Sequence, residues 1–323
     1  MVAVTARQRG SLNVLDAFPA SIAQLPATEL ADALGGPTLF DLREPDTPPL
    51  FVSVLLHGNE TSGWDAVRRL VGEISAASLL LFVGNVEAAR RGTRSIPGGL
   101  DFNRVWEGGD TPEAAIADEV TAFAAAARPY LAVDVHNNTG DNPPYAVVTD
   151  TCRRTLSVAR AFARRALLTA QPEGFLSRRF ADFCTAVTVE VGMPQDAGST
   201  ERAASFLSRL LTSPAAPDDD PADLALFETT ARVLLTRGAV IEPSAQRFNF
   251  RAAPAGTALT RSGPLVAEDA SGDDVTDAYL AHENGAMVLK RNTHVAMYTG
   301  SEESARLDCL CYLLQPFSGQ RRG

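Results

Sequence analysis

Short apolar runs alternate with stretches of helical periodicity along the first two thirds of the chain. Runs rich in valine and leucine predict strands near residues 50–56, 79–84, 131–136, 145–149 and 185–191. Apolar residues at helical spacing predict helices over residues 60–75, 111–128, 153–170, 200–212 and 222–236. The helix at 111–128 has a clear start, because Thr111 suits the capping position and Pro112 the first helical position. This alternation predicts an α/β fold, in which helices cover both faces of a mostly parallel mixed sheet.

The pattern changes near residue 238. Glycine, proline and short β-prone runs, such as residues 246–250 and 286–289, follow it. The 323 residues also exceed the usual size of one domain. We therefore expect an α/β domain over residues 1–238 and a small β-rich domain over residues 239–323 that partly covers the cleft of the first.

Histidine and glutamate stand where two of the predicted strands end. His57 and Glu60 follow the strand near 50–56, and His136 ends the strand near 131–136. Zn²⁺ takes imidazole and carboxylate ligands, and a catalytic zinc site uses three protein ligands. In open α/β sheets such sites lie beyond the carboxyl ends of strands. A His-x-x-Glu tetrapeptide alone is common by chance, but its context favours a site for one zinc ion per chain, which another divalent ion could occupy in vitro.

Glu190 is a lone carboxylate among the β-branched residues of the strand near 185–191. One interpretation is a side chain at the strand end that faces water. The other places it in a partly desolvated cleft, where its raised pKa would suit it to take a proton from a metal-activated water and pass it to a leaving nitrogen. The neighbouring metal site favours the second interpretation.

The glycine-rich loop over residues 94–104 contains Arg94, Asn103 and Arg104. Arginine presents a planar set of donors that meets carboxylate oxygens in pairs, and asparagine adds a neutral donor. The loop is thus suited to bind a substrate carboxylate. The alternative is an exposed loop in which Asp101 and an arginine form a weak salt bridge.

Several blocks, in this order, resemble the succinylglutamate desuccinylase/aspartoacylase family of the zinc carboxypeptidase superfamily. They are Leu-His-Gly-Asn-Glu at 56–60, Gly-Asn-Val-Glu-Ala at 84–88, Asp-Phe-Asn-Arg at 101–104, Asp-Val-His-Asn-Asn-Thr at 134–139 and Val-Glu-Val-Gly at 189–192. The resemblance covers about residues 45–195. It implies that His57, Glu60 and His136 bind zinc and that Glu190 is the general base and acid.

The resemblance also implies roles for the loop residues. Asn103 and Arg104 match the pair that binds the substrate carboxylate, and Arg94 stands near the arginine that polarises the scissile carbonyl. The loop between Arg94 and residue 101 is about two residues longer than the usual form in the family, so Arg91 or Arg90 is an alternative for that role.

Two further comparisons with aspartoacylases concern the substrate. Arg178 and Arg179 lie upstream of Glu190, where aspartoacylases place another substrate-binding arginine. The segment 282–288 resembles the one that carries their active-site tyrosine, but it contains no tyrosine, and Tyr298 and Tyr279 fit that position poorly. This difference argues against N-acetylaspartate as the substrate.

These features predict a zinc-dependent amidohydrolase that cleaves a small anionic N-acyl amino acid, of the desuccinylase or deacetylase type. Two alternatives remain open. One is a metallocarboxypeptidase that acts on a peptide, and the other is a metal-binding or ligand-binding protein without turnover. Only a protein without turnover would leave Glu190→Gln without a measurable effect on activity.

Charge and composition narrow the partners and the location. The net charge of -10 and the pI near 5.0 disfavour nucleic acid and anionic membranes as partners. No segment approaches the roughly 18 apolar residues that span a bilayer, so we expect a cytoplasmic protein, with a homo-oligomer left open. The four scattered cysteines argue against a disulfide framework, and Cys309 and Cys311 fit a strand edge or helix end better than half of a metal site. We expect His282 and His294 to be surface or loop residues.

Overall fold

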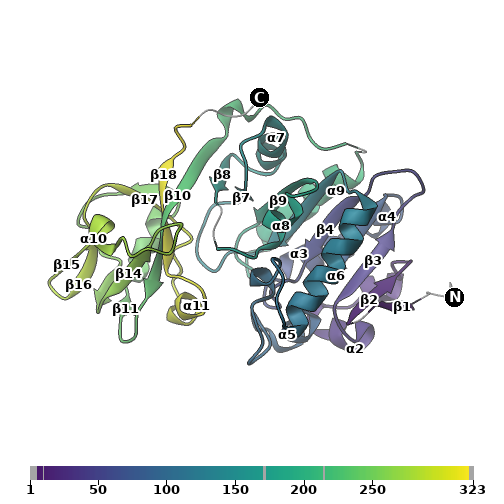
Figure 1. Cartoon of the computed structure of the whole chain (residues 1–323), viewed down its shortest axis with the longest axis horizontal. Coiled ribbons are helices and arrows are strands. Elements are labelled where there is room, and N and C mark those ends of the chain that lie inside the picture. The colour runs from purple at the N-terminus through teal and green to yellow at the C-terminus, as the bar shows by residue number, and fades with distance from the viewer. Residues whose placement is uncertain (1–5, 10, 170–171, 214, 320–323) are drawn as a thin grey trace.

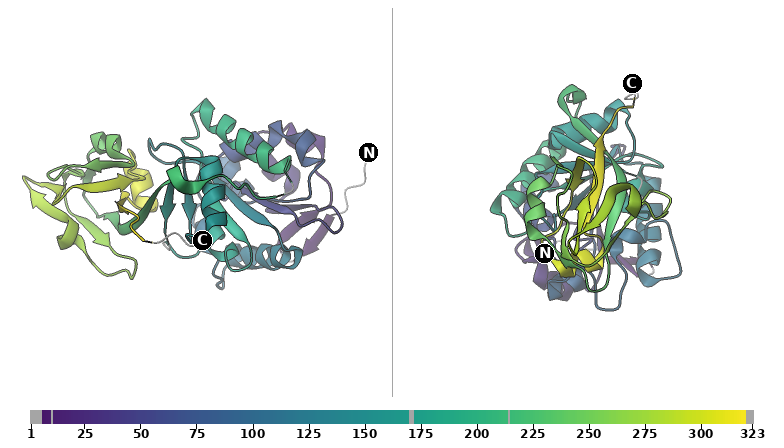
Figure 2. Two further views of the ribbon diagram at one scale, coloured as in Figure 1. Left: turned by 90° about the horizontal axis from the view of Figure 1, so that it is seen from above. Right: turned by 90° about the vertical axis from the view of Figure 1, so that its left-hand side faces the viewer.

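The structure is a computed structural model that describes residues 6–9, 11–169, 172–213 and 215–319. It has two parts that lie side by side along its longest axis (Figure 1). The α/β part lies within residues 6–213, and the C-terminal part, residues 215–319, is rich in strands (Figure 2). The predicted class is confirmed: a mixed α/β fold with a further small β-rich part.

The longest helix of the described residues is α6, with 16 residues, and none of the helices described is long and apolar enough to cross a membrane. The helices are α1 (Ala20–Ala23), α2 (Leu30–Leu34), α3 (Ser62–Arg69), α4 (Val71–Ile74), α5 (Val86–Arg91), α6 (Pro112–Ala127), α7 (Arg153–Phe162), α8 (Leu176–Phe180), α9 (Ala197–Leu211), α10 (Thr276–Tyr279) and α11 (Glu302–Leu307). Short 3₁₀ helices cover Ala27–Glu29, Phe102–Arg104, Pro221–Asp223 and Pro243–Phe248.

The strands follow the same division. Those of the α/β part are β1 (Ala6–Arg9), β2 (Leu12–Leu15), β3 (Thr38–Leu42), β4 (Leu50–Val54), β5 (Leu79–Val83), β6 (Leu131–His136), β7 (Tyr145–Val148), β8 (Arg165–Leu168) and β9 (Thr185–Glu190). Those of the C-terminal part are β10 (Ala225–Leu235), β11 (Val240–Ile241), β12 (Arg251–Ala253), β13 (Thr260–Ser262), β14 (Leu265–Glu268), β15 (Leu280–Glu283), β16 (Ala286–Leu289), β17 (Thr293–Ala296) and β18 (Cys311–Pro316).

One large sheet runs through both parts in the order β1-β2-β3-β5-β4-β6-β9-β7-β8-β10-β18-β17-β12, and β14 also pairs with β10. Its centre, β5-β4-β6-β9, is parallel. Strand β10 is parallel to β8 on one side and antiparallel to β18 on the other. The long strand β10 therefore joins the two parts, and the domain boundary at residue 238 stays a prediction.

Alternate side chains of the central strands enter two different cores. In β4, Val52 and Val54 belong to the core beneath α3 and α9, whereas Phe51 belongs to the core beneath α6 and α8. Strands β5 and β6 alternate in the same way. Because successive side chains of a strand point to opposite faces, helices must cover both faces of such a sheet.

Most elements of the α/β part agree with the predicted ones, and three predictions were wrong. The helix expected over 153–170 ends at Phe162, because the residues that follow form β8 between β7 and β10. The helix expected over 222–236 is strand β10, and the strand expected at 246–250 overlaps a 3₁₀ helix that begins at Pro243. In β10, pairing with three neighbouring strands overrides the helical propensity of its alanines and leucines.

Candidate active site

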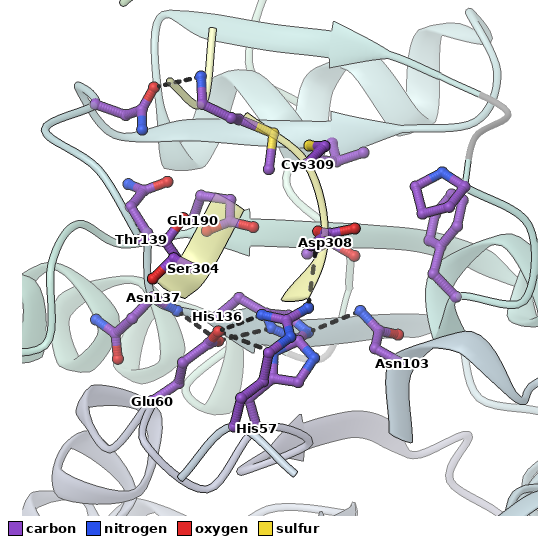
Figure 3. A pocket seen from close by; sticks show the side chains of 18 of the residues that line it. His57, Glu60, Asn103, His136, Asn137, Thr139, Glu190, Ser304, Asp308 and Cys309 are labelled. Atoms are coloured by element: carbon purple, nitrogen blue, oxygen red, sulfur yellow. Dashed lines mark hydrogen bonds and ion pairs between the residues drawn. The ribbon is translucent and has the colours of Figure 1, made fainter. Parts of the chain in front are cut away.

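The predicted metal ligands and Glu190 come together at the carboxyl ends of three adjacent parallel strands (Figure 3). His57 and Glu60 lie in the loop after β4, while His136 is the last residue of β6. Glu190 is the last residue of β9 and lies opposite His136 in the register of the sheet. Side chains that are distant in sequence thus meet at one edge of the sheet.

The loop after β4 has a constrained backbone. Buried Leu55 has a φ of 58°, a left-handed conformation that non-glycine residues seldom adopt. Gly58 then passes so close to α5 that a Cβ there would lie 2.1 Å from the backbone nitrogen of Ala89. The backbone amide of Glu60 donates to the carbonyl oxygen of His57 at 3.1 Å, which closes the turn. These constraints place both side chains on the same side of the loop.

Three ligand atoms converge between these loops. The Nδ1 atom of His57 lies 2.8 Å from Oε1 of Glu60, and Nδ1 of His136 lies 2.8 Å from Oε2. The ligand atoms of these three residues all lie within 4.8 Å of one another, and each residue is at most 5 % exposed. Two imidazole nitrogens and a carboxylate that face one another fit the ligand set of a zinc site with an open position.

Two further aspartates hold the outer nitrogens of the histidines. Nε2 of His57 lies 2.9 Å from Oδ1 of Asp101, and Nε2 of His136 lies 2.7 Å from Oδ2 of Asp134. Burial lowers the pKa of His136, but Asp134 and Glu60 outweigh it and raise that pKa well above its ordinary value. Such carboxylates orient a histidine and make it a stronger metal ligand. The sequence suggested Asp101 only as the salt-bridge partner of an arginine, and it did not indicate the role of Asp134.

Glu190 is buried, with 8 % of its surface exposed. Burial, helped by the negative charge of Glu60, raises the pKa of Glu190 to about 8, although His136 and Arg94 act in the opposite direction. A carboxyl group with such a pKa gains and loses its proton near neutral pH. The water-exposed alternative for Glu190 is therefore wrong.

Arg94 reaches the same site. Its Nε donates to Oδ2 of Asp101 at 2.9 Å, its Nη1 lies 3.5 Å from Oε1 of Glu60, and its side chain is 14 % exposed. Arg90 and Arg91 instead have exposed side chains that pair with Asp32 and Glu87 on the surface. Of the three arginines considered for the carbonyl, Arg94 is the one that lines the cavity.

Asn103 and Arg104 also line the cavity. Nδ2 of Asn103 lies 3.3 Å from Nε2 of His136, and Oδ1 of Asn103 accepts from the backbone amide of Leu176 at 3.0 Å. Arg104 donates to the carbonyl oxygen of Asn103 at 2.8 Å and to Oδ2 of Asp308 at 2.9 Å. The predicted carboxylate-binding pair is therefore beside the metal ligands, but Arg104 already contacts an aspartate.

The structure does not bring Arg178 and Arg179 to this site. Both lie on α8 with exposed side chains; Arg178 donates to Glu107 at 3.1 Å and Arg179 to Asp182 at 2.8 Å. They line a separate surface depression rather than the cavity with the histidines.

The cavity is open to solvent, and about 120 Å³ of it can hold the centres of water-sized molecules. The C-terminal part contributes wall residues, among them Ser304, Asp308 and Tyr312. Tyr312 is thus a tyrosine from the C-terminal part that the sequence analysis missed, whereas the hydroxyl of Tyr298 donates to the carbonyl oxygen of Leu259 at 2.6 Å. His282 is exposed, and His294 is a half-buried residue of β17 rather than a loop residue.

Asn138 has an unusual position in the cavity wall. Only 4 % of its surface is exposed, and neither its Nδ2 nor its Oδ1 has a hydrogen-bond partner among the described residues. Both amide atoms have almost no accessible surface, so the Asn138 amide is an unsatisfied polar group inside the wall, which is costly for the fold.

Comparison with known proteins agrees with this geometry. The catalytic-domain model of the succinylglutamate desuccinylases and aspartoacylases matches residues 46–212. No curated protein sequence matches the chain.

Similar solved structures share the fold. The succinylglutamate desuccinylase of Chromobacterium violaceum is 21% identical, with a TM-score of 0.57 over 84% of this chain and 85% of its own. The succinylglutamate desuccinylase of Vibrio cholerae is 15% identical, with a TM-score of 0.61 over 85% of this chain and 84% of its own. Murine aminoacylase 3 is 16% identical, with a TM-score of 0.58 over 85% of this chain and 97% of its own.

Proposed function

The chain belongs to the succinylglutamate desuccinylase/aspartoacylase family, and from this premise we propose that it is a zinc-dependent amidohydrolase that cleaves the amide bond of a small N-acyl amino acid. The observation that carries the proposal is one cavity that unites His57, Glu60 and His136 with the buried carboxyl group of Glu190. Similar folds include proteins named succinylglutamate desuccinylase and aminoacylase, and these names support an N-acyl amino acid as the substrate class.

His57 and His136, through their Nδ1 atoms, and Glu60 would hold the zinc ion, with Asp101 and Asp134 keeping the imidazoles in place. A zinc ion bound there supplies a Lewis acid, which lowers the pKa of water and polarises a carbonyl group. The donor set fits this ion, because neutral imidazole and carboxylate are its usual partners besides thiolate.

Glu190 would act as the proton carrier of the reaction. Its carboxylate accepts a proton from the water that attacks the amide carbonyl, and its carboxylic acid then donates that proton to the leaving nitrogen. Burial beside the metal ligands raises the pKa of Glu190 to about 8 in the metal-free protein, and a bound cation would act against this rise, which brings the carboxylate form within reach at neutral pH. The products are a carboxylic acid and a free amino acid.

Arg94 would stabilise the negative charge that develops on the carbonyl oxygen. Asp101 holds its guanidinium at 2.9 Å, so that little reorganisation is needed during the reaction. Asn103 and Arg104 would position the carboxylate of the amino acid. Each of these groups would act on the substrate by hydrogen bonding within a partly desolvated cavity.

The C-terminal part favours a small substrate over a peptide. Residues from α11 and from the turn before β18 form one wall of the cavity, so a long chain would meet them on its way to the metal ligands. A metallocarboxypeptidase would use the same ligands but needs room for several residues of its substrate.

The proposal is tested with a panel of N-acetyl, N-succinyl and N-formyl amino acids, with dipeptides alongside, and with zinc content measured. The proteins are the wild type, Glu190→Gln and, as the matched control, Glu201→Gln on the exposed surface of α9. We expect turnover of an acyl amino acid by the wild type and the control, and its loss in Glu190→Gln with zinc retained. Turnover of dipeptides alone would favour the peptidase, and equal turnover by all three proteins would exclude Glu190 as the proton carrier. A zinc-loaded wild type that is inert to the whole panel would contradict the proposed function.

A further inference from the structure

Asp308 places a negative charge in the cavity where an anionic substrate is expected to bind. Its Oδ2 accepts from Nη2 of Arg104 at 2.9 Å and lies 3.9 Å from Nη2 of Arg94 (Figure 3). The side chain is 22 % exposed, and its residue lines the cavity together with both arginines. Asp308 belongs to the C-terminal part, and 204 residues separate it from Arg104.

The backbone around Asp308 is held from several sides. The backbone amide of Asp308 donates to the carbonyl oxygen of Ser304 at 3.3 Å, and that of Leu310 donates to Val233 of β10 at 2.8 Å. Cys309 and Tyr312, which follow Asp308 in the chain, are buried. The carboxylate is therefore a fixed part of the cavity wall in this structure.

The charge of Asp308 is present at neutral pH. Burial raises the pKa of Asp308, but Arg104 and Arg94 outweigh it and hold that pKa below its ordinary value. Arg94 in turn donates from its Nε to Oδ2 of Asp101 at 2.9 Å. The two guanidiniums thus each have a carboxylate partner before any substrate enters.

This pairing limits how many substrate carboxylates the two arginines can bind. Arg104 uses one N–H for the carbonyl oxygen of Asn103 and one for Asp308, and a guanidinium has five N–H donors. One substrate carboxylate can therefore share the remaining donors. A second carboxylate would have no counter-charge on these arginines and would meet Asp308, and like charges across a binding surface disfavour a ligand strongly.

We propose that Asp308 determines the substrate class, by disfavouring N-acyl amino acids with an acidic side chain and favouring those with a neutral or cationic one. This inference rests on the proposed function, since it concerns the same cavity. Asp308 is a specificity-determining residue in this proposal and takes no part in bond cleavage.

The alternative is that Asp308 only ties the two parts of the chain together through Arg104. A structural tie would alter stability, but it would not distinguish substrates that differ by charge alone. N-acetylglutamine and N-acetylglutamate are such a pair, because their shapes are nearly equal and one carries an additional carboxylate.

The experiment measures kcat and KM for this pair, and for N-acetyl-ornithine, with wild type, Asp308→Asn and Glu303→Gln. Glu303 is the matched control, because it lies exposed on α11 and does not line the cavity. We expect the wild type to prefer glutamine and ornithine derivatives. We expect Asp308→Asn to shift the ratio toward N-acetylglutamate by about tenfold or more, mainly through KM, because an isosteric change removes the repulsion. Glu303→Gln should leave the ratio unchanged.

Two outcomes would overturn the inference. One is that the wild type prefers N-acetylglutamate to N-acetylglutamine, which can be measured without any variant. The other is a ratio in Asp308→Asn equal to that in Glu303→Gln while both proteins remain folded and active. Calorimetric binding of the same pair to the zinc-loaded proteins measures the preference even without turnover, so a failure of the proposed function is distinguishable from a failure of this inference.

Discussion

Replacing Glu190 by glutamine should stabilise the metal-free protein, and the gain should depend on pH. Glutamine has nearly the same shape but no charge to bury. In the wild type, burial raises the pKa of Glu190 from an ordinary 4.5 to about 8. The same burial that suits this carboxyl group to proton transfer therefore makes its ionised form costly.

The direction and size follow from proton binding in the folded and unfolded states. Below pH 4.5 the carboxyl group of Glu190 is protonated in both states, so it does not contribute to the pH dependence of the stability. Between 4.5 and 8 the folded state keeps a proton that the unfolded state has lost, so stability falls as the pH rises. Each pH unit in this range lowers the free energy of unfolding of the wild type by about 1.4 kcal/mol. The total loss therefore reaches about 5 kcal/mol above pH 8.

The assay is thermal unfolding of the two proteins, stripped of metal with a chelator, from pH 5 to pH 9. An unfolding entropy of about 2.1 cal/mol/K per residue converts 5 kcal/mol into a difference in Tm of about 7 °C for a chain of this length. The two melting temperatures should nearly coincide at pH 5 and separate in favour of Glu190→Gln at pH 9. Other groups titrate in both proteins and largely cancel in the comparison.

Parallel pH profiles for the two proteins would refute this reasoning, because they would show that Glu190 titrates alike in the folded and unfolded chain. A wild type more stable than the variant at pH 9 would refute it more strongly, since Glu190 would then have a stabilising partner for its charge. The Glu201→Gln variant should show no such divergence, because Glu201 is exposed on α9.

Three further changes have defined outcomes. Arg94→Ala should lower kcat by about 10²- to 10³-fold with a smaller change in KM, as steady-state kinetics would show, because a donor to the developing oxyanion is lost; equal kcat would remove Arg94 from that role. Asp134→Asn should weaken zinc binding by about 10- to 100-fold in competition with a chromophoric chelator, since His136 loses its outer partner at 2.7 Å, and an unchanged affinity would contradict the geometry. Gly58→Ala should lower the free energy of unfolding by about 2 kcal/mol or more in urea titrations, because its Cβ would lie 2.1 Å from the backbone of Ala89; a neutral effect would show that the loop yields easily.

The centre of the fold was predictable because its signals are local. The strand near 131–136 was predictable from its run of apolar residues. That run reflects the structure, where every residue of β6 is buried and its apolar side chains enter both cores. The helix at 111–128 was clear because Thr111 caps it, with its side chain accepting from the backbone of Ala114. The segments 153–170 and 222–236 were mistaken for helices because their state depends on partner strands, which single-sequence periodicity does not contain.

The candidate site divides in the same way. His57, Glu60 and His136 were found because each lies at a strand end that the apolar runs predict. Asp134 had a usable signal, since it precedes His136 by two positions and alternate residues of a strand share a face. Asp308 had none, because only the packing of the C-terminal part against the cavity brings it to Arg104. Arg178 was placed near the substrate by sequence position alone, but its helix directs it to Glu107 on the surface.

Metal reconstitution tests the central proposal most directly. Zinc is removed with a chelator and returned stepwise while hydrolysis of the preferred N-acyl amino acid is followed. The account predicts no hydrolysis without metal, a rise in rate that ends at one zinc ion per chain, and no recovery in His136→Ala. Full activity in the metal-free protein, or one bound zinc ion per chain in His136→Ala with wild-type activity, would contradict it.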